Sequence, residues 1–460
     1  MTVFKIPRQR GDSSLTGWFL PKDIQILSSW LRRFTKELET RQNTTKRLHP
    51  VVEDLKVLIE STPELRMLAS GMFDEVPDKD PYRQDPIGHK QVRDYKHMLE
   101  LFSVITTEVA PSWQMTTYNV GLVGAPFNAI LDWPMGTRSG FSFFTRPDVN
   151  KKLKAILDTW RDEVLSTRKS QYVVTTEKGG WLCKEAVAVI EKDTNVDGQP
   201  WYTFQDMFVC DPTGDRLHWG FRSWNDFFVR RFRDMDKFRP VAHPNKHEWV
   251  VNACESMPYG LESNVSEYDK FWLKGHNYSV AEMLHHHDFT SAFVGGTVYQ
   301  AFLSATSYHR WSSPVTGQVV YAGIINGTYF SEPITEGFEN PNGPDPSAPN
   351  RSQTYLPQVA TRAVIFIQAP EPIGLMCIIF IGMADISTCE IASRFCANLP
   401  QPVAKGEELG MFHHGGSSHC LLFRKGVKLA WSVGAIPGKA KKNLPIRSEL
   451  AMAYKDAEIM

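Results

Sequence analysis

The sequence predicts an α+β fold, in which a helical N-terminal part precedes a mostly antiparallel, β-rich part. Apolar residues recur at three- and four-residue spacing early in the chain, as in amphipathic helices. From about residue 240 this spacing shortens to two and β-branched residues become common, as in strands. A chain of 460 residues is also longer than one hydrophobic core usually supports. We therefore expect a helical domain over 1–168, a helical connecting segment over 169–239 and a β-rich domain over 240–460.

The helical pattern is clearest in two stretches near the N-terminus. Their apolar positions lie on one helix face: Ile24, Leu27, Trp30, Leu31 and Phe34 in the first, and Val52, Leu55, Leu58 and Ile59 in the second. An apolar run over 95–109 predicts a further helix that ends before Pro111. Three prolines and many charges predict a loop over 74–86. The simplest role for these helices is a cap or a dimerisation domain.

Four later segments have the composition and period of strands. They are Gly317–Phe330, Arg362–Ala369, Gly374–Met383 and His419–Lys425. The segment 340–353 lies between the first two and is rich in Pro, Asn, Gly and Ser. We expect it to form a long exposed loop that could serve as a lid.

Charge and cysteine content exclude several classes of protein. Lys+Arg and Asp+Glu are equal at 51 each, so no overall charge favours nucleic acid. Seven cysteines occur without a CxxC pair, which predicts neither a disulfide framework nor a zinc or other metal site. No run of about 18 apolar residues and no apolar signal-peptide core is present. We expect a soluble, cytoplasmic protein without stable membrane insertion.

A Gly-Gly-Ser-Ser run at 415–418 stands between two apolar segments. Glycine reaches positive φ freely and serine suits turns, so the run fits a tight connection between strands. The wider segment 406–423 resembles the self-cleavage site of phosphatidylserine decarboxylases, pyruvoyl enzymes whose usual sequence there is Leu-Gly-Ser-Thr. The resemblance implies that the bond between Gly416 and Ser417 breaks.

The resemblance also implies a chemistry for that bond. The serine hydroxyl attacks the preceding carbonyl, the resulting ester undergoes elimination, and the dehydroalanine formed hydrolyses to a covalent pyruvoyl cofactor. The products are a β chain, 1–416, and an α chain, 417–460, which stay associated. The pyruvoyl carbonyl would take up electrons as CO₂ leaves an amino acid substrate, a task that cofactors perform in other decarboxylases.

The segment 308–317 is similar to the family's Tyr-His-Arg-x-His-x-Pro-x-x-Gly. The match implies that His309 is an active-site histidine that assists proton transfer. Ser312 stands where the family has a second histidine, the base that activates the cleavage serine. The family's third residue, an aspartate in the phosphatidylserine enzymes, corresponds to Glu255, and glutamate is typical of a soluble subgroup. The implied triad is therefore Glu255, Ser312 and Ser417.

Ser312 predicts slow self-processing. A hydroxyl whose pKa lies far above neutral cannot act as the base, and a general base typically contributes roughly 100- to 10,000-fold. Three explanations are open: an engineered block that preserves the precursor, a natural change compensated by His413, His414 or His419, and a relative that has lost processing.

Three further segments indicate the subgroup and the substrate. They are 137–146, which also fits a loop that buries three phenylalanines, 221–233, which also fits a helix with an aromatic and a cationic face, and 381–390. All three are similar to the soluble fungal subgroup that includes the L-tryptophan decarboxylase of psilocybin biosynthesis. The resemblance implies an aromatic L-amino acid as substrate, with conversion of L-tryptophan to tryptamine first. A non-catalytic binding protein with this fold is the alternative, and a phosphatidylserine decarboxylase is less favoured.

Overall fold

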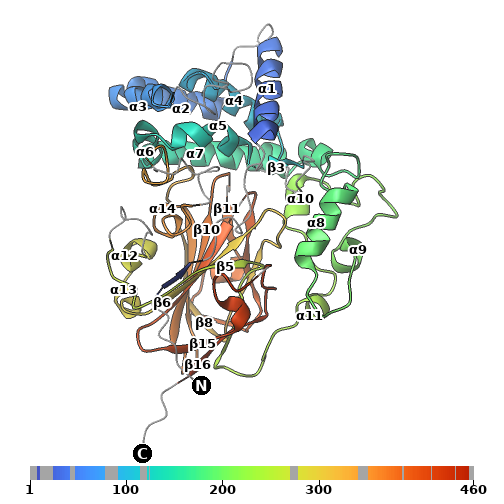
Figure 1. Ribbon diagram of the computed structural model, residues 1–460, viewed down its shortest axis with the longest axis vertical. Coiled ribbons are helices and arrows are strands. Elements are labelled where there is room, and N and C mark those ends of the chain that lie inside the picture. The colour runs from blue at the N-terminus through green and yellow to red at the C-terminus, as the bar shows by residue number, and fades with distance from the viewer. Residues whose placement is uncertain are drawn as a thin grey trace, which may run out of the picture.

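The structure is a computed structural model in which helices cover one end of a set of antiparallel sheets (Figure 1). It describes residues 8–10, 24–41, 47–77, 92–113, 122–123, 125–269, 278–339, 351–385, 388–415, 417–440 and 442–454. Gly416, the residue predicted to precede the cleaved bond, lies outside these residues. The predicted α+β fold class is confirmed.

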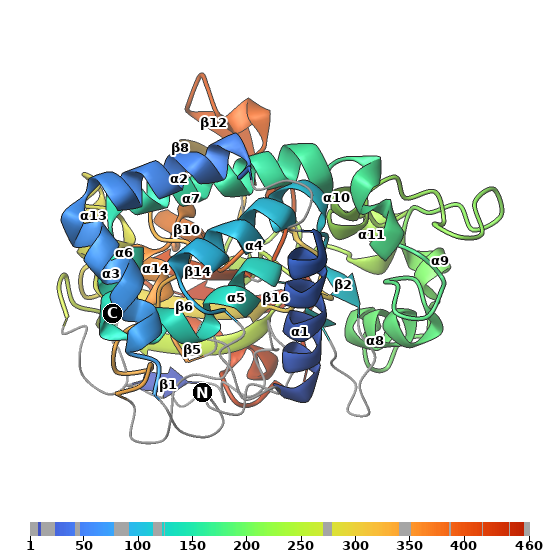
Figure 2. The same cartoon turned by 90° about the horizontal axis from the view of Figure 1, so that it is seen from above.

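Seven helices that the structure describes in the N-terminal part form a layer across the ends of the strands. They are α1 (Ile24–Arg41), α2 (Pro50–Ser61), α3 (Pro63–Asp74), α4 (Tyr95–Glu108), α5 (Pro126–Met135), α6 (Arg138–Phe144) and α7 (Pro147–Trp160). Figure 2 shows α2, α4, α5 and α7 lying over β10 and β14. Prolines at the first turn begin four of these helices, where a missing N–H costs nothing. The three predicted helical stretches match α1, α2 and α4.

The alternative interpretation of 137–146 as a loop that buries three phenylalanines is wrong. Most of its residues form α6, which begins at Arg138. Thr137 caps this helix, because its side chain accepts a hydrogen bond from the Gly140 N–H at 2.9 Å. This N-terminal cap satisfies a backbone donor that a loop would leave free. Two of the three phenylalanines, Phe143 and Phe144, are buried as expected.

Short helices dominate the connecting part of the chain. After a π-helical turn, Arg161–Leu165, come a 3₁₀ helix, Arg168–Val173, and then α8 (Lys184–Thr194), α9 (Phe204–Met207), α10 (Trp224–Phe228) and α11 (Met235–Phe238). The helix predicted over 221–233 is thus much shorter than expected. Its cationic face was also wrong in part, because Arg230 is buried over the rings of Phe208 and Phe227.

An eight-stranded antiparallel sheet forms the centre of the β-rich part. Its order is β1 (Arg8–Arg10), β5 (Met257–Ser263), β6 (Thr297–Leu303), β14 (Ser417–Phe423), β10 (Leu375–Gly382), β9 (Arg362–Gln368), β8 (Gly317–Ile325) and β12 (Gln401–Val403). The four predicted strands correspond to β8, β9, β10 and β14. Strand β14 is buried throughout, and its successive residues alternate between two hydrophobic cores on opposite faces of the sheet.

The structure also contains smaller sheets, two in the β-rich part and one in the N-terminal part. The first joins β11 (Thr388–Ile391), β13 (Glu408–His413) and β7 (Arg310–Ser312), the second joins β15 (Lys428–Trp431), β16 (Glu449–Tyr454) and β4 (Trp249–Val251), and the third pairs β2 (Ser112–Trp113) with β3 (Leu122–Val123). Short helices α12 (Val280–Met283), α13 (Thr290–Phe293) and α14 (Leu356–Val359) flank the large sheet, and 3₁₀ turns occur at Ser393–Phe395 and Val433–Ala435. Trp311 of β7 stacks on Phe380 of β10 with ring centroids 3.9 Å apart, which joins the first small sheet to the large one.

Three further predictions concern surface and compartment. Most of the predicted lid, 340–350, lies outside the described residues, whereas Ser352 and Gln353 at its end are buried rather than exposed. All seven cysteines are free thiols. Among the helices that the structure describes, none combines the length and the apolar character needed to cross a membrane.

Candidate active site

Ser417 is the first residue of β14, the strand between β6 and β10 in the large sheet. It lies opposite Leu303 on one side and Gly382 on the other. The residue is fully buried, and its hydroxyl makes no hydrogen bond with any residue that the structure describes. A buried hydroxyl normally finds a partner, so the unpaired Ser417 hydroxyl needs an explanation, and a role in chemistry is one.

The chain reaches Ser417 through a left-handed turn. Residue His414 has φ 60° and Gly415 has φ 106°, directly after β13 and before β14. The predicted connection between two strands is therefore present, and it crosses from the small sheet to the large one. A left-handed conformation costs roughly 1–2 kcal/mol for a residue with a Cβ atom, and this cost falls on His414. Stored strain of this kind is common at reactive sites.

His309 lies beside the same turn. Its carbonyl accepts a hydrogen bond from the Phe412 N–H at 3.0 Å, and its ring stacks on Phe228 with centroids 3.9 Å apart. Neither ring nitrogen has a hydrogen-bond partner of ordinary geometry among the described residues. Burial and the Arg230 charge hold the pKa of His309 well below its usual value, although the Ser304 backbone opposes this shift. The imidazole is therefore neutral near pH 7.

Ser312 is fixed through its backbone. Its N–H donates to the Ala253 carbonyl at 2.9 Å, and it lies opposite Glu408 in the small sheet. The hydroxyl is buried and has no partner in the described part of the chain. The structure therefore places Ser312 next to the segment that contains Glu255.

The Glu255 carboxylate points to an arginine. Arg239 Nε donates to Oε1 at 3.1 Å and to Oε2 at 3.0 Å, and the Ile446 N–H donates to Oε2 at 2.8 Å. Both charged side chains are 3% exposed, so this is a buried ion pair. Within the described ranges no hydrogen bond joins Glu255 to Ser312 or Ser417. The implied triad stays a prediction.

A cavity of about 270 Å³ adjoins Glu255. Two residues of its lining hold the loop before His309: Asp193 accepts from the Thr306 hydroxyl at 2.6 Å, and the Asn443 amide donates to the Ser307 hydroxyl at 2.9 Å. These two hydrogen bonds therefore hold the residues that lead into His309.

The three histidines considered as replacement bases differ in their surroundings. His413 has Nδ1 2.8 Å from the Asn225 side-chain oxygen and Nε2 2.7 Å from the Glu390 carboxylate, so neither nitrogen is free. His414 and His419 are fully buried without partners among the described residues. Burial lowers the pKa of His419 to about 3 and that of His414 well below its usual value. Both nitrogens of His413 are therefore engaged, whereas His414 and His419 keep nitrogens that are unpaired within the described ranges and whose basicity burial lowers strongly.

The sequence reasoning missed the contacts of the 221–233 segment with the site. Its Asn225 binds His413, its Phe228 stacks on His309, and its Arg230 donates to the Thr306 carbonyl at 2.7 Å. The family pattern Asn-Asp-Phe-Phe-x-Arg was the available signal, but it gave no partners for these side chains.

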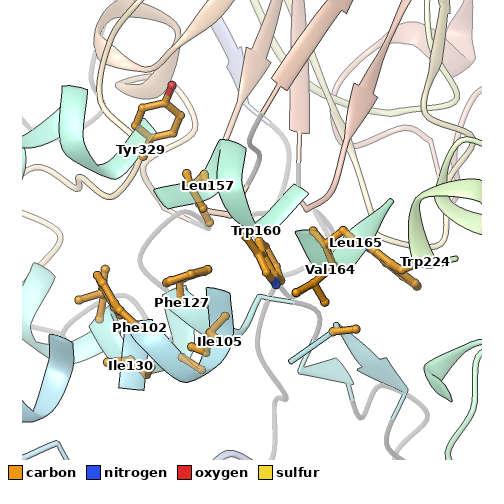
Figure 3. Close-up of a cluster of buried hydrophobic side chains, with 14 of the residues drawn as sticks. Phe102, Ile105, Phe127, Ile130, Leu157, Trp160, Val164, Leu165, Trp224 and Tyr329 are labelled. Atoms are coloured by element: carbon orange, nitrogen blue, oxygen red, sulfur yellow. The ribbon is translucent and has the colours of Figure 1, made fainter. Parts of the chain in front are cut away.

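Asp385 connects the helical layer to the strand beside Ser417. It follows the end of β10 and accepts hydrogen bonds from the Phe127 and Asn128 N–H groups, each at 3.0 Å, at the start of α5. Burial raises the pKa of Asp385 to about 8, although the two N–H groups oppose this shift. Figure 3 shows Phe127 and Trp160 in the resulting apolar cluster, with ring centroids 5.2 Å apart. The carboxyl group thus holds the start of α5, and with it Phe127, at the end of β10.

Comparison with protein families agrees with this geometry. Residues 49–190 and 224–441 each match a family model described as phosphatidylserine decarboxylase. The antiparallel fold and these matches define a carboxy-lyase, and the chain belongs to the phosphatidylserine decarboxylase family.

Fungal relatives place the chain within a subgroup of that family. Decarboxylase iboD of Amanita muscaria (strain Koide BX008) is 37% identical over 339 residues, which cover 72% of this chain and 92% of the relative. An L-tryptophan decarboxylase of Psilocybe cubensis is 34% identical over 423 residues, covering 89% and 88%. Another of Psilocybe cyanescens is 39% identical over 317 residues, covering 67% and 70%. The chain is similar to these proteins over most of its length and groups with them.

Proposed function

We propose that the chain is a proenzyme that cleaves itself between Gly416 and Ser417 and then decarboxylates an aromatic L-amino acid, L-tryptophan to tryptamine first. The β chain, 1–416, and the α chain, 417–460, would stay associated through strands β6, β10 and β14. The observation that carries the proposal is the buried, unpaired Ser417 hydroxyl behind a left-handed turn. We place the enzyme in the cytoplasm.

The surroundings of Ser417 suit a pyruvoyl group. The Ser417 hydroxyl oxygen is the atom that attacks during cleavage and leaves during elimination. Because it makes no hydrogen bond with the described residues of the uncut chain, its removal breaks none with them. Once formed, the group would supply the electron sink for decarboxylation. His309 is neutral, so its ring can accept or donate a proton beside the substrate. Phe228 holds that ring by stacking, which fixes the direction of its nitrogens.

The segments take different parts in this proposal. The β-rich domain, 240–460, would carry the catalytic residues. The connecting segment, 169–239, would orient His309 and His413 through α10. The helical domain, 1–168, would cover the site with aromatic side chains of α5 and α7.

The choice of an aromatic substrate rests on two supports. Two of the fungal relatives are named L-tryptophan decarboxylases. In addition, the rings of Trp160 and Phe228 each lie 6.2 Å from that of His414, three residues before Ser417. Aromatic rings pair well at 4.5–7 Å, so rings at these positions can bind an aromatic side chain.

A parallel assay tests the proposal. CO₂ release would be measured from L-tryptophan, L-phenylalanine and phosphatidylserine, with the intact mass recorded before and after and the Ser417→Ala chain as control. We expect release from tryptophan only in protein that has become two chains. CO₂ release from phosphatidylserine alone would favour a phosphatidylserine decarboxylase. A single chain that stays inert even after Ser312→His would favour the non-catalytic alternative.

A further inference from the structure

The His414 side chain lies against two aromatic residues from different parts of the chain. Its ring centroid lies 6.2 Å from that of Trp160, at the end of α7, and 6.2 Å from that of Phe228, in α10. The side chain is fully buried, and neither ring nitrogen has a hydrogen-bond partner among the residues that the structure describes. Burial of an imidazole without partners is unfavourable, so His414 occupies this space at a cost in free energy.

The backbone of His414 adds to that cost. Its φ of 60° belongs to the left-handed region, which side chains with a Cβ atom disfavour. The strands on both sides hold it there, since β13 ends at His413 and β14 begins at Ser417. Cleavage after residue 416 would release one of these two constraints. His414 would then be the third residue from a free chain end, able to relax its backbone and hydrate its ring.

The two walls are fixed independently of His414. Trp160 donates from its indole N–H to the Val109 carbonyl at 2.7 Å, and it packs edge-on against Phe127 at 5.2 Å. Phe228 stacks on His309 at 3.9 Å. The walls would therefore remain in place if the imidazole left.

We propose that His414 is a placeholder for the aromatic ring of the substrate. In the uncut chain it fills the space between Trp160 and Phe228, and cleavage at 416/417 frees it to leave. The emptied space then accepts the ring of a substrate that is bound at the new N-terminus of the α chain. This inference rests on the proposed function and deepens it, because it names the residues that select an aromatic side chain.

The uncut chain allows a test that needs neither cleavage nor activity. In the Ser417→Ala background, His414→Gly should leave a ring-sized gap that binds benzene, measured by calorimetry and by the shift in melting temperature. Ser417→Ala alone should not bind benzene at the same concentration. Adding Trp160→Ala should weaken benzene binding by about tenfold or more, because one aromatic wall is lost. Trp160→Phe keeps an aromatic wall and should retain most of the benzene binding. This variant shows whether the loss in Trp160→Ala comes from the missing ring and not from a folding defect.

His419→Gly in the same background is the matched control. It removes an equally buried imidazole from β14, whose neighbours are Tyr299 and Phe380. Any benzene binding there should be indifferent to Trp160→Ala. Absence of binding in the folded His414→Gly protein, or binding that does not depend on Trp160, would overturn the placeholder.

Cleaved protein, whose two chains are first verified by mass, supplies the second arm. Diethyl pyrocarbonate should modify His414 in cleaved protein and spare it in Ser417→Ala. Indole, which has no amine to react, should inhibit decarboxylation competitively, and Trp160→Leu should raise both its inhibition constant and the KM for L-tryptophan with a smaller change in kcat. Protection of His414 after cleavage would refute its release. If no cleaved protein forms under any condition, the proposed function fails, and the benzene arm still decides whether the gap exists.

Discussion

Replacing Ser312 with histidine should turn a slowly processed chain into a two-chain protein. The Ser312 hydroxyl is buried, unpaired within the described ranges and unable to accept a proton near neutral pH. An imidazole has an ordinary pKa near 6.5. Position 312 is buried, and burial disfavours the charged form of an imidazole, so a histidine there should be neutral at pH 7, the form that acts as a base. A general base of this kind should accelerate cleavage by about 1,000-fold, from roughly a day to minutes.

The assay follows the fraction of cleaved chain by intact mass after purification at pH 7.5. Ser312→Asn is the matched control, because it brings a planar polar side chain without a basic nitrogen. Combining Ser312→His with Ser417→Ala should abolish cleavage and so locate the nucleophile. Rapid, complete cleavage of the unsubstituted chain, or equal acceleration by Ser312→Asn, would refute the reasoning. In the first case His414 and His419 become the candidate bases, since both nitrogens of His413 are already engaged.

Four further predictions test single residues. Ser417→Ala should leave one chain of 52.3 kDa on a denaturing gel, and two chains would place the nucleophile elsewhere. His309→Ala, in a background that cleaves, should still give two chains but lower kcat by roughly 100-fold; an unchanged kcat would remove its catalytic role. Arg239→Met should lower the free energy of unfolding in urea by about 3–5 kcal/mol, because Glu255 would be left charged and buried, and Glu255→Gln should restore part of the loss; equal stability of all three proteins would contradict this. Asp385 has a folded pKa of about 8 against an ordinary 3.8, so its stabilising contribution is full below pH 3.8 and is lost as the pH rises through 8. From pH 5 to 8 the unsubstituted chain should therefore lose stability relative to Asp385→Asn, by up to about 1.4 kcal/mol per pH unit. Parallel pH curves for the two proteins would contradict this.

Local patterns in the sequence were sufficient to predict the strands around Ser417. The apolar segments 374–383 and 419–425 have the composition of buried strands, and the glycine–serine run between apolar segments indicated a connection. These features depend on neighbouring residues only. The pairing of β14 with β6 and β10 depends on register between distant segments, which no local pattern contains.

The contacts that organise the site join residues far apart in the sequence, so residue spacing could not predict them. Glu255 binds Arg239, a residue that appeared in the sequence analysis only as the end of the connecting segment 169–239. Asp385 caps a helix that begins more than 250 residues earlier. Arg230 was predicted on a cationic surface because charged residues usually remain exposed. It is buried instead, because two aromatic rings and a backbone carbonyl offset the loss of water.

The central claim is that Ser417 becomes a pyruvoyl group that reacts with an aromatic amino acid. The most direct measurement is the intact mass of the α chain after the Ser312→His protein has been incubated with L-tryptophan and sodium cyanoborohydride. The account predicts a chain that begins at residue 417, lacks a free α-amine before the incubation and gains the mass of reductively trapped tryptamine or tryptophan after it. An α chain with an ordinary N-terminal serine, a break at another bond, or a mass that tryptophan leaves unchanged would contradict it.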